Sequence, residues 1–350
     1  MKLSRRKLLT TLAAGFAGHN LCIAMPFAFH DSESALDDRD PKWQAAIDRG
    51  LTWLVAQQSR LGYWNHDTYT TAITSLAGIA LIASGSTTIQ GPYAKAIRAT
   101  VDYLLSKCRS NGLIGDPQRD HRYTYGHGFA MLFLSQILGE EEDNDRRTEL
   151  TEVLERAVQF SVDAQTKEGG WGYVSGKDQD FDEGSTTITQ VQALRGCRNA
   201  GIVVPKTVID NALSYIYKCK NTDGGISYST TTRGDSRPAI TAASLAALYE
   251  AGDYASKHIP EMWAYCKKNL HDFKRDQYGH WHYTYLYYSQ VVYRQGPGEW
   301  EPFRDGLYDY ILSQQTAEGA WDVSIDESYA TSVCLIILQL DMGLLPIFQR

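Results

Sequence analysis

The chain has 350 residues, of which 43% are hydrophobic and 21% are charged, and its formal net charge is −7. This acidic balance opposes binding to nucleic acid or to an anionic membrane surface. The length exceeds what one simple hydrophobic core usually serves, so it favours either two domains or a repeat architecture.

The first 24 residues have the pattern of an export signal. Arg5 and Arg6 precede a short apolar run at 8–24, which ends in a small-x-Ala cleavage pattern at Cys22-Ile23-Ala24. We predict a twin-arginine signal peptide at 1–24, a polar linker at 25–40 and a periplasmic or otherwise extracytoplasmic mature protein. A basic tail and an uncleaved anchor are the alternatives. The run is too short and too polar to span a bilayer well, so we expect no stable membrane span after cleavage. Cleavage would remove four basic and no acidic side chains and change the net charge to −11.

From Pro41 onward the chain repeats one unit, which consists of a helix, a Gly-x-Trp turn, a loop, a second helix and a glycine. An aromatic residue lies eleven residues before five of the six turn positions, and a glutamine lies six residues before three of them. The turn positions, spaced 40 to 57 residues apart, are Trp64, Ile114, Trp171, Ile226, Trp281 and Trp321. Self-similarity at such a period is typical of a repeat protein.

The two helices of a unit differ in their apolar pattern. The first is amphipathic, as at 149–165, whereas the second is apolar nearly all round, as at 72–83 and 333–340. These patterns are typical of half-exposed outer helices and buried inner helices. Six such pairs without a β-rich stretch predict an all-α fold, an (α/α)6 toroid over 41–350. An open solenoid is the alternative. The five cysteines after the signal form no C-x-x-C pair, which indicates small buried residues rather than a disulfide framework.

The unit resembles the repeat of squalene and oxidosqualene cyclases and of protein prenyltransferase β-subunits, from Pro41 to the C-terminus. In these families the Gln and Trp of the repeat are structural. The resemblance therefore implies that the glutamines tie outer helices to the starts of inner helices, while the tryptophans pack beside them. The residues concerned are Gln58, Gln165, Gln315, Trp64, Trp171 and Trp321.

The catalytic elements of these families are matched only in part. The cyclases protonate their substrate with an Asp-x-Asp-Asp-Thr element, and the corresponding segment here runs from Asp180 to Thr186 without an adjacent Asp-Asp pair. Asp182 and Asp180 are the candidate acids, with a solvated acidic loop as the alternative. The Asp-x-Cys zinc pair of the prenyltransferases is absent, and the chain has one barrel where cyclases usually have two. We predict neither a metal nor a cofactor.

The starts of the inner helices form the working face in these families, and their free N–H groups favour such a role. Here they are rich in Tyr, Ser and Thr, whose alternative roles are helix capping and core packing. His127 lies between two glycines and is a third catalytic candidate, with a structural role as its alternative. The candidate ligand-binding residues are Tyr125, Ser185, Thr186, Tyr283, Tyr285 and Tyr329. We predict that one cavity on the ring axis brings together Tyr125, His127, Asp182, Ser185, Tyr283, Tyr285 and Tyr329.

The resemblance implies an exported terpenoid-cyclase-like toroid that acts on an isoprenoid or another lipid by acid catalysis in its central cavity. Hydroxyls and imidazoles at the helix starts equally suit a non-catalytic ring that holds a peptide or a glycan. A polysaccharide-active (α/α)6 enzyme is the third hypothesis, and its two carboxylates would come from Asp182 and Asp326. In each case the partner is a small molecule or lipid in the central cavity, and the sequence does not determine the oligomeric state.

Overall fold

The computed structural model describes residues 39–274, 279–323, 325–345 and 347. The predicted signal peptide and nearly all of the predicted linker lie outside these ranges. Twelve α-helices, a short 3-10 helix and three isolated β-bridges make up the regular structure of the described part. The outer helices are α3 (Pro41–Ala56), α5 (Ala94–Ser106), α7 (Asn144–Ala164), α9 (Lys206–Lys218), α11 (Ile259–Leu270) and α13 (Pro297–Ser313). The inner helices are α4 (Thr70–Ala83), α6 (Tyr123–Glu140), α8 (Gly184–Asn199), α10 (Pro238–Ala251), α12 (Trp281–Arg294) and α14 (Glu327–Leu338).

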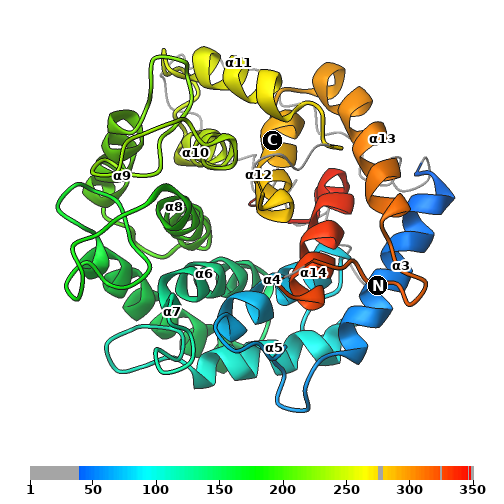
Figure 1. Cartoon of the computed structure of the whole chain (residues 1–350). Helices are drawn as coiled ribbons and strands as arrows, with labels where there is room; N and C mark the ends of the chain where they lie inside the picture. The colour runs from blue at the N-terminus through cyan, green and yellow to red at the C-terminus, as the bar shows by residue number, and fades with distance from the viewer. Residues whose placement is uncertain (1–38, 275–278, 324, 346, 348–350) are drawn as a thin grey trace, which may run out of the picture.

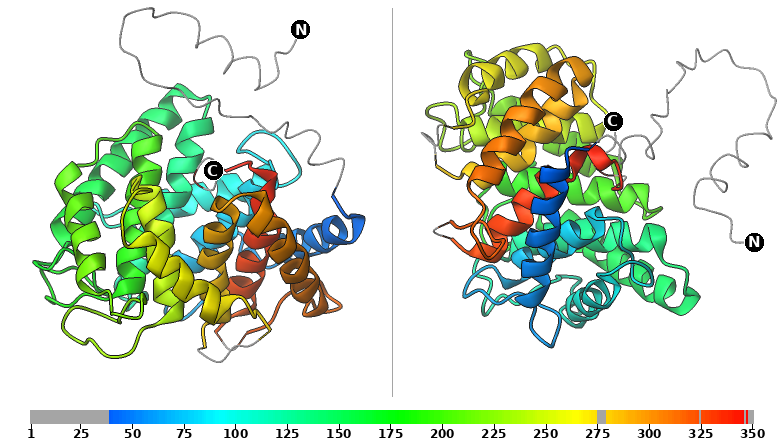
Figure 2. Two further views of the ribbon diagram at one scale, coloured as in Figure 1. Left: turned by 90° about the horizontal axis from the view of Figure 1, so that it is seen from above. Right: turned by 90° about the vertical axis from the view of Figure 1, so that its right-hand side faces the viewer.

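The helices form two concentric rings (Figure 1). Each inner helix packs against the next one in chain order, and α14 packs against α4, so the inner ring is closed. The outer ring closes at the same place, where α13 contacts α3, and Figure 2 shows the two helices side by side. The predicted (α/α)6 toroid is therefore confirmed, and the open solenoid is excluded.

Burial explains which helix of each pair lies inside. All residues of α4 are buried, and its sequence contains no charged residue. The neighbouring outer helix α5 buries one face, which includes Ile97, Val101 and Leu104, and exposes charged residues on the other. A helix that is apolar all round is stable only when other helices surround it, whereas an amphipathic helix suits the outer layer. None of the helices in the described part is both long and apolar enough to cross a membrane.

The tryptophan of the repeat pins the turn to the two helices of its own unit. The Trp171 indole Nε1 donates to the Ser161 carbonyl of α7 at 2.8 Å, and its backbone N–H donates to Thr187 Oγ1 of α8 at 3.0 Å. Trp64 and Trp321 make the same pair of bonds in their own units. These tryptophans are almost completely buried, which confirms their structural role.

The glutamines have a different partner from the one that the resemblance implied. Gln165 Nε2 donates to the carbonyls of Gly169 and Val208, both at 2.9 Å, and Val208 belongs to the next outer helix, α9. The turn itself explains this, because a Cβ on Gly169 would lie 2.5 Å from the Asn211 carbonyl of α9, at a backbone φ of +98°. The turn therefore packs directly on the neighbouring unit. The expected bond to the start of an inner helix was wrong.

The last repeat uses the same bond to close the ring. Gln315 Nε2 donates to the carbonyl of Gly319 at 3.0 Å and to that of Ala46 in the first outer helix at 2.9 Å. Arg49 of the same first helix donates to Gln315 Oε1. The side chain that joins neighbouring units elsewhere thus joins the last unit to the first.

The fifth repeat departs from the predicted alignment. Trp281 is the first residue of α12 rather than part of a turn, it is half-buried, and its indole donates to the Phe273 carbonyl at 2.7 Å. The 40-residue spacing from Trp281 to Trp321 is the shortest of the five, and Leu270 replaces the usual aromatic residue. The turn position predicted at Trp281 was therefore wrong.

The cysteines of the described part are all unpaired. Cys197, Cys219, Cys266 and Cys334 are buried and Cys108 is half-buried. The prediction of small buried residues is confirmed for these four.

Candidate functional site

Three helix starts meet near the ring axis, as their hydroxyl-rich sequences predict. The Tyr125 hydroxyl of α6 is hydrogen-bonded to Ser185 Oγ of α8, and the Tyr283 hydroxyl of α12 donates to the Ser185 carbonyl at 3.3 Å. Burial raises the pKa of Tyr125 and of Tyr283 well above its ordinary value, yet both side chains keep some exposed surface. Tyr329 of α14 is likewise half-buried, and burial raises its pKa.

Glu183 organises the centre of this cluster, and the sequence analysis missed it. It is fully buried at the N-cap of α8, where its carboxylate accepts from the backbone N–H of Ser185 at 2.8 Å and of Thr186 at 2.6 Å. It also accepts from the Tyr125 hydroxyl at 3.2 Å. A carboxylate at this position satisfies the free N–H groups and the partial positive charge of the helix start. The signal in the sequence was a glutamate immediately before Gly-Ser-Thr.

Thr186 belongs to this cap rather than to a ligand surface. It is fully buried, and its Oγ1 lies 2.6 Å from the Glu183 carboxylate and 2.7 Å from the Trp171 carbonyl. These bonds assign it to the helix start and the turn.

His127 points away from the axis. It is fully buried, its Nδ1 accepts from the Ile114 backbone N–H at 3.1 Å, and its Nε2 lies 3.2 Å from the Ala157 carbonyl of α7. Burial lowers its pKa from the ordinary value to about 4. His127 therefore takes the role that Thr187 has beside Trp171, which is to hold the turn against the inner helix, and we leave it out of the site.

Tyr285 is also directed to the outer layer. Its hydroxyl donates to the Leu270 carbonyl of α11 at 3.0 Å, and only 2% of the residue is exposed. Tyr285 follows Tyr283 by two residues, as His127 follows Tyr125. Two residues of an α-helix are separated by about 200° around its axis, so the second of each pair faces away from the first.

The two candidate acids lie in the loop before α8, away from the axis. Asp182 is 4% exposed, accepts from Thr166 Oγ1 at 2.9 Å and packs beside Gly170, and burial raises its pKa. Asp180 is exposed and lies 3.7 Å from the Lys167 ammonium. Of the seven residues predicted to share one cavity, Tyr125 and Tyr283 contact Ser185, and Tyr329 is half-buried at the start of α14. Asp182, His127 and Tyr285 are instead directed to the outer layer.

A cavity at this face has a volume of about 520 Å³ and lies between the starts of α12 and α14 and the end of α13. Aromatic rings form much of its wall, and Ile311 and Cys334 add apolar surface. The aromatic lining residues are His280, Trp281, His282, Tyr310, Trp321 and Tyr329. Of the seven residues predicted to share one cavity, Tyr329 alone is among its described lining. Neither Asp182 nor Asp326 lines it, and the Asp326 carboxylate accepts from the Tyr329 backbone N–H at 2.9 Å as the cap of α14. The pair of carboxylates proposed for a polysaccharide-active enzyme therefore does not flank this cavity.

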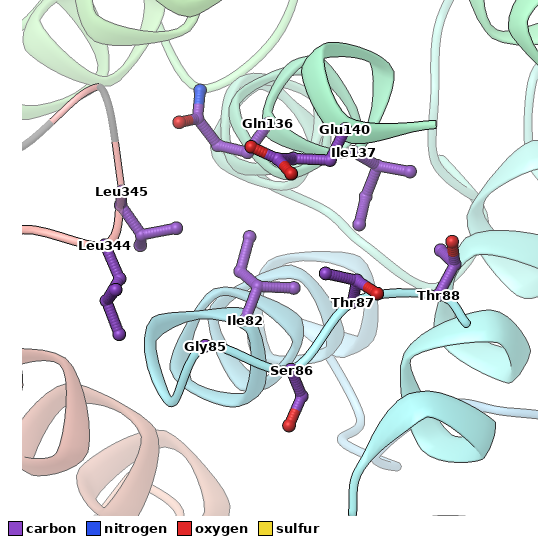
Figure 3. Close-up of a pocket in the computed structure, with 10 residues that line it drawn as sticks. All are labelled: Ile82, Gly85, Ser86, Thr87, Thr88, Gln136, Ile137, Glu140, Leu344 and Leu345. Carbon is purple, nitrogen blue, oxygen red and sulfur yellow. The ribbon is translucent and has the colours of Figure 1, made fainter. Parts of the chain in front are cut away.

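A second cavity lies at the opposite face, where the inner helices end (Figure 3). Its walls come from the ends of α4 and α6 and from the C-terminal residues Leu344 and Leu345. Its volume of about 30 Å³ has room for only one or two water molecules. The 520 Å³ cavity is thus the better candidate for a ligand.

A closed ring of six helix pairs, with an aromatic cavity where the inner helices begin, defines the class of α/α toroid proteins. A family model described as the prenyltransferase alpha-alpha toroid domain matches residues 22–203 and 187–284. These ranges include most of the chain, which therefore belongs to this family.

The solved structures that match share the fold at low sequence identity. A type II terpene cyclase from Scytonema, MstE, in complex with its substrate geranylgeranyl dihydroxybenzoate, is 12% identical with a TM-score of 0.59, and the match covers 87% of this chain and 98% of the cyclase. The complex of MstE with its product merosterolic acid A gives 14% identity and a TM-score of 0.58 at the same coverage. A protein from Actinoplanes is 14% identical with a TM-score of 0.59, over 85% of this chain and 98% of its own. No curated protein sequence matches the chain significantly.

Proposed function

We propose that the chain is an exported, terpenoid-cyclase-like toroid that binds an isoprenoid or a similarly elongated lipid in the 520 Å³ cavity. The observation that carries the proposal is the aromatic wall of this cavity on the face where the inner helices begin. Cavities that bury most of a small ligand and are lined by aromatic rings are the usual form of a binding site for apolar molecules. The isoprenoid ligands of MstE, which has the same fold, support the choice of ligand.

We propose ligand binding rather than catalysis, because the carboxyl groups described at this face are poorly placed for acid catalysis. Glu183 is fully engaged in the helix cap, Asp180 is exposed, and Asp182 faces the outer layer. Acid-catalysed cyclisation remains a hypothesis with Asp182 as the proton donor, since burial raises its pKa.

The test uses the purified protein from residue 25 and geranylgeraniol as the probe, with binding followed by intrinsic tryptophan fluorescence. Ile325 lines the cavity and is 43% exposed, so Ile325→Asp removes apolar contact with a ligand and leaves the core intact. We expect about tenfold weaker binding, since burying an isoleucine contributes about 1.5–3 kcal/mol. The matched control is Leu61→Asp, which changes an apolar side chain that is 72% exposed and lies outside the cavity lining.

Three outcomes decide between the hypotheses. Equal affinities of the wild type, Ile325→Asp and Leu61→Asp would place the ligand elsewhere and refute the cavity assignment. Binding of an oligosaccharide or a peptide in place of geranylgeraniol would support the non-catalytic alternative for such ligands. A cyclised product that is detected by chromatography and lost in Asp182→Asn would replace the binding proposal by an enzymatic one.

A further inference from the structure

The 520 Å³ cavity has few side chains that can carry a charge in its described lining. None of them is lysine or arginine, the one carboxylate is that of the exposed Asp322, and the two imidazoles are those of the exposed His280 and the half-buried His282. Arg122, whose guanidinium lies 4.2 Å from the ring of Tyr173, belongs to another part of the rim and does not line the cavity. An anionic group in this cavity would meet a carboxylate and no described cation, and would lose its hydration without compensation.

His282 supplies the half-buried imidazole of the described lining, whereas the imidazole of His280 is exposed. No hydrogen-bond partner for the His282 ring is found in the described part of the chain, and the ring packs 6.1 Å from that of Tyr329. Burial lowers the pKa of His282 to about 4, so its imidazole is neutral at physiological pH. A neutral imidazole presents one N–H donor and one acceptor nitrogen, and either can bind a hydroxyl.

We infer that this cavity selects an uncharged isoprenoid alcohol, whose hydroxyl binds the His282 imidazole while its chain lies along the aromatic wall. The inference rests on the proposed function and adds the chemistry of the polar end of the ligand. It predicts discrimination against diphosphate and carboxylate forms of the same isoprenoid, because the site offers them no described cation and the Asp322 carboxylate repels them.

The first experiment compares three ligands with one C20 chain: geranylgeraniol, geranylgeranyl diphosphate and the hydrocarbon that lacks the hydroxyl group. The alcohol should bind about tenfold more tightly than either of the others. Preferential binding of the diphosphate would overturn the inference and leave the proposed lipid site standing. If none of the three ligands binds, the proposed function and the inference both fail.

The second experiment separates a hydroxyl contact from a structural role of His282. His282→Phe keeps an aromatic ring and removes both nitrogens. It should weaken binding of the alcohol about fivefold to tenfold, as expected for the loss of one neutral hydrogen bond, and leave the affinity for the hydrocarbon unchanged. An equal loss for both ligands would show that the imidazole only shapes the wall. Asp322→Asn should improve binding of the diphosphate without affecting the alcohol, and an unchanged diphosphate affinity would contradict the role given to its charge.

Discussion

The buried carboxyl group of Glu250, at the end of α10, gives a prediction about how stability depends on pH. Glu250 is 2% exposed, its Oε1 accepts from Gln192 Nε2 at 2.9 Å, and Arg294 Nη2 lies 3.6 Å from the same oxygen. Its Oε2 has no hydrogen-bond partner among the residues that the structure describes. Burial raises its pKa from 4.5 to about 7, although Arg294, Gln192 and Arg195 act in the opposite direction.

The direction of the pH dependence follows from the pKa of Glu250 in the unfolded and in the folded chain. An acid that holds its proton more tightly in the folded state favours folding at low pH, and this contribution is lost as the pH rises from the unfolded pKa to the folded one. For Glu250 the window runs from 4.5 to about 7. One pH unit corresponds to about 1.4 kcal/mol, so the full loss is about 3 kcal/mol. Glu250→Gln, which resembles the protonated form, should avoid it.

The assay is urea denaturation of the wild type and Glu250→Gln at pH 5 and pH 8. The unfolding free energy of the variant minus that of the wild type should be about 2–3 kcal/mol larger at pH 8 than at pH 5. Glu152→Gln, on the exposed face of α7, is the control and should show no such change. A difference between Glu250→Gln and the wild type that is the same at both pH values would refute the argument that the buried carboxyl titrates in this window.

Three further predictions concern the repeat and the signal. Trp171→Ala should lower the unfolding free energy by about 3–5 kcal/mol in denaturant titration without changing the ligand affinity of the folded protein. An unchanged denaturation midpoint would contradict the role of Trp171 in holding the turn against α7 and α8. Gln315→Ala and Gln165→Ala should each cost about 1–3 kcal/mol, since each removes the two hydrogen bonds that the side-chain amide donates, and a neutral Gln315→Ala would show that its bond to the first repeat does not hold the ring closed. Replacement of Arg5 and Arg6 by lysine should leave unprocessed protein in the cytoplasm, as cell fractionation would show, and normal export of this variant would exclude the twin-arginine route.

The fold was predictable because the sequence shows two patterns, the apolar pattern within each helix and the recurrence of the whole unit along the chain. The apolar pattern separated inner from outer helices, and the Gly-x-Trp or Gly-x-Ile turns marked every unit except the fifth. The partner of Gln165 was not predictable in this way. Its amide crosses to the carbonyl of Val208 in another unit, and the sequence of one repeat contains no information about the face that its neighbour presents.

The site residues were predicted from their places at the starts of the inner helices, and the side chains that turn outward do so for a simple geometric reason. Tyr125 and Tyr283 contact Ser185 of α8, while His127 and Tyr285 follow them by two residues and face the outer helices. The helical period alone would have separated these pairs. The role of Glu183 required a different observation, because a glutamate before a helix start becomes part of a site only when a tyrosine from another unit reaches it.

Ring closure also determines when this chain can finish folding. The bond from Gln315 to Ala46 joins residues 269 positions apart, and Arg39 donates to the carbonyl of Leu338 at 2.9 Å across an even longer separation. The first outer helix therefore leaves the ribosome long before its final neighbours exist, and its apolar face stays uncovered during most of synthesis. Contacts of such separation slow folding and prolong the exposure of apolar surface. A nascent chain that stops short of the last repeat should consequently be a substrate for chaperones and proteases rather than a smaller stable ring.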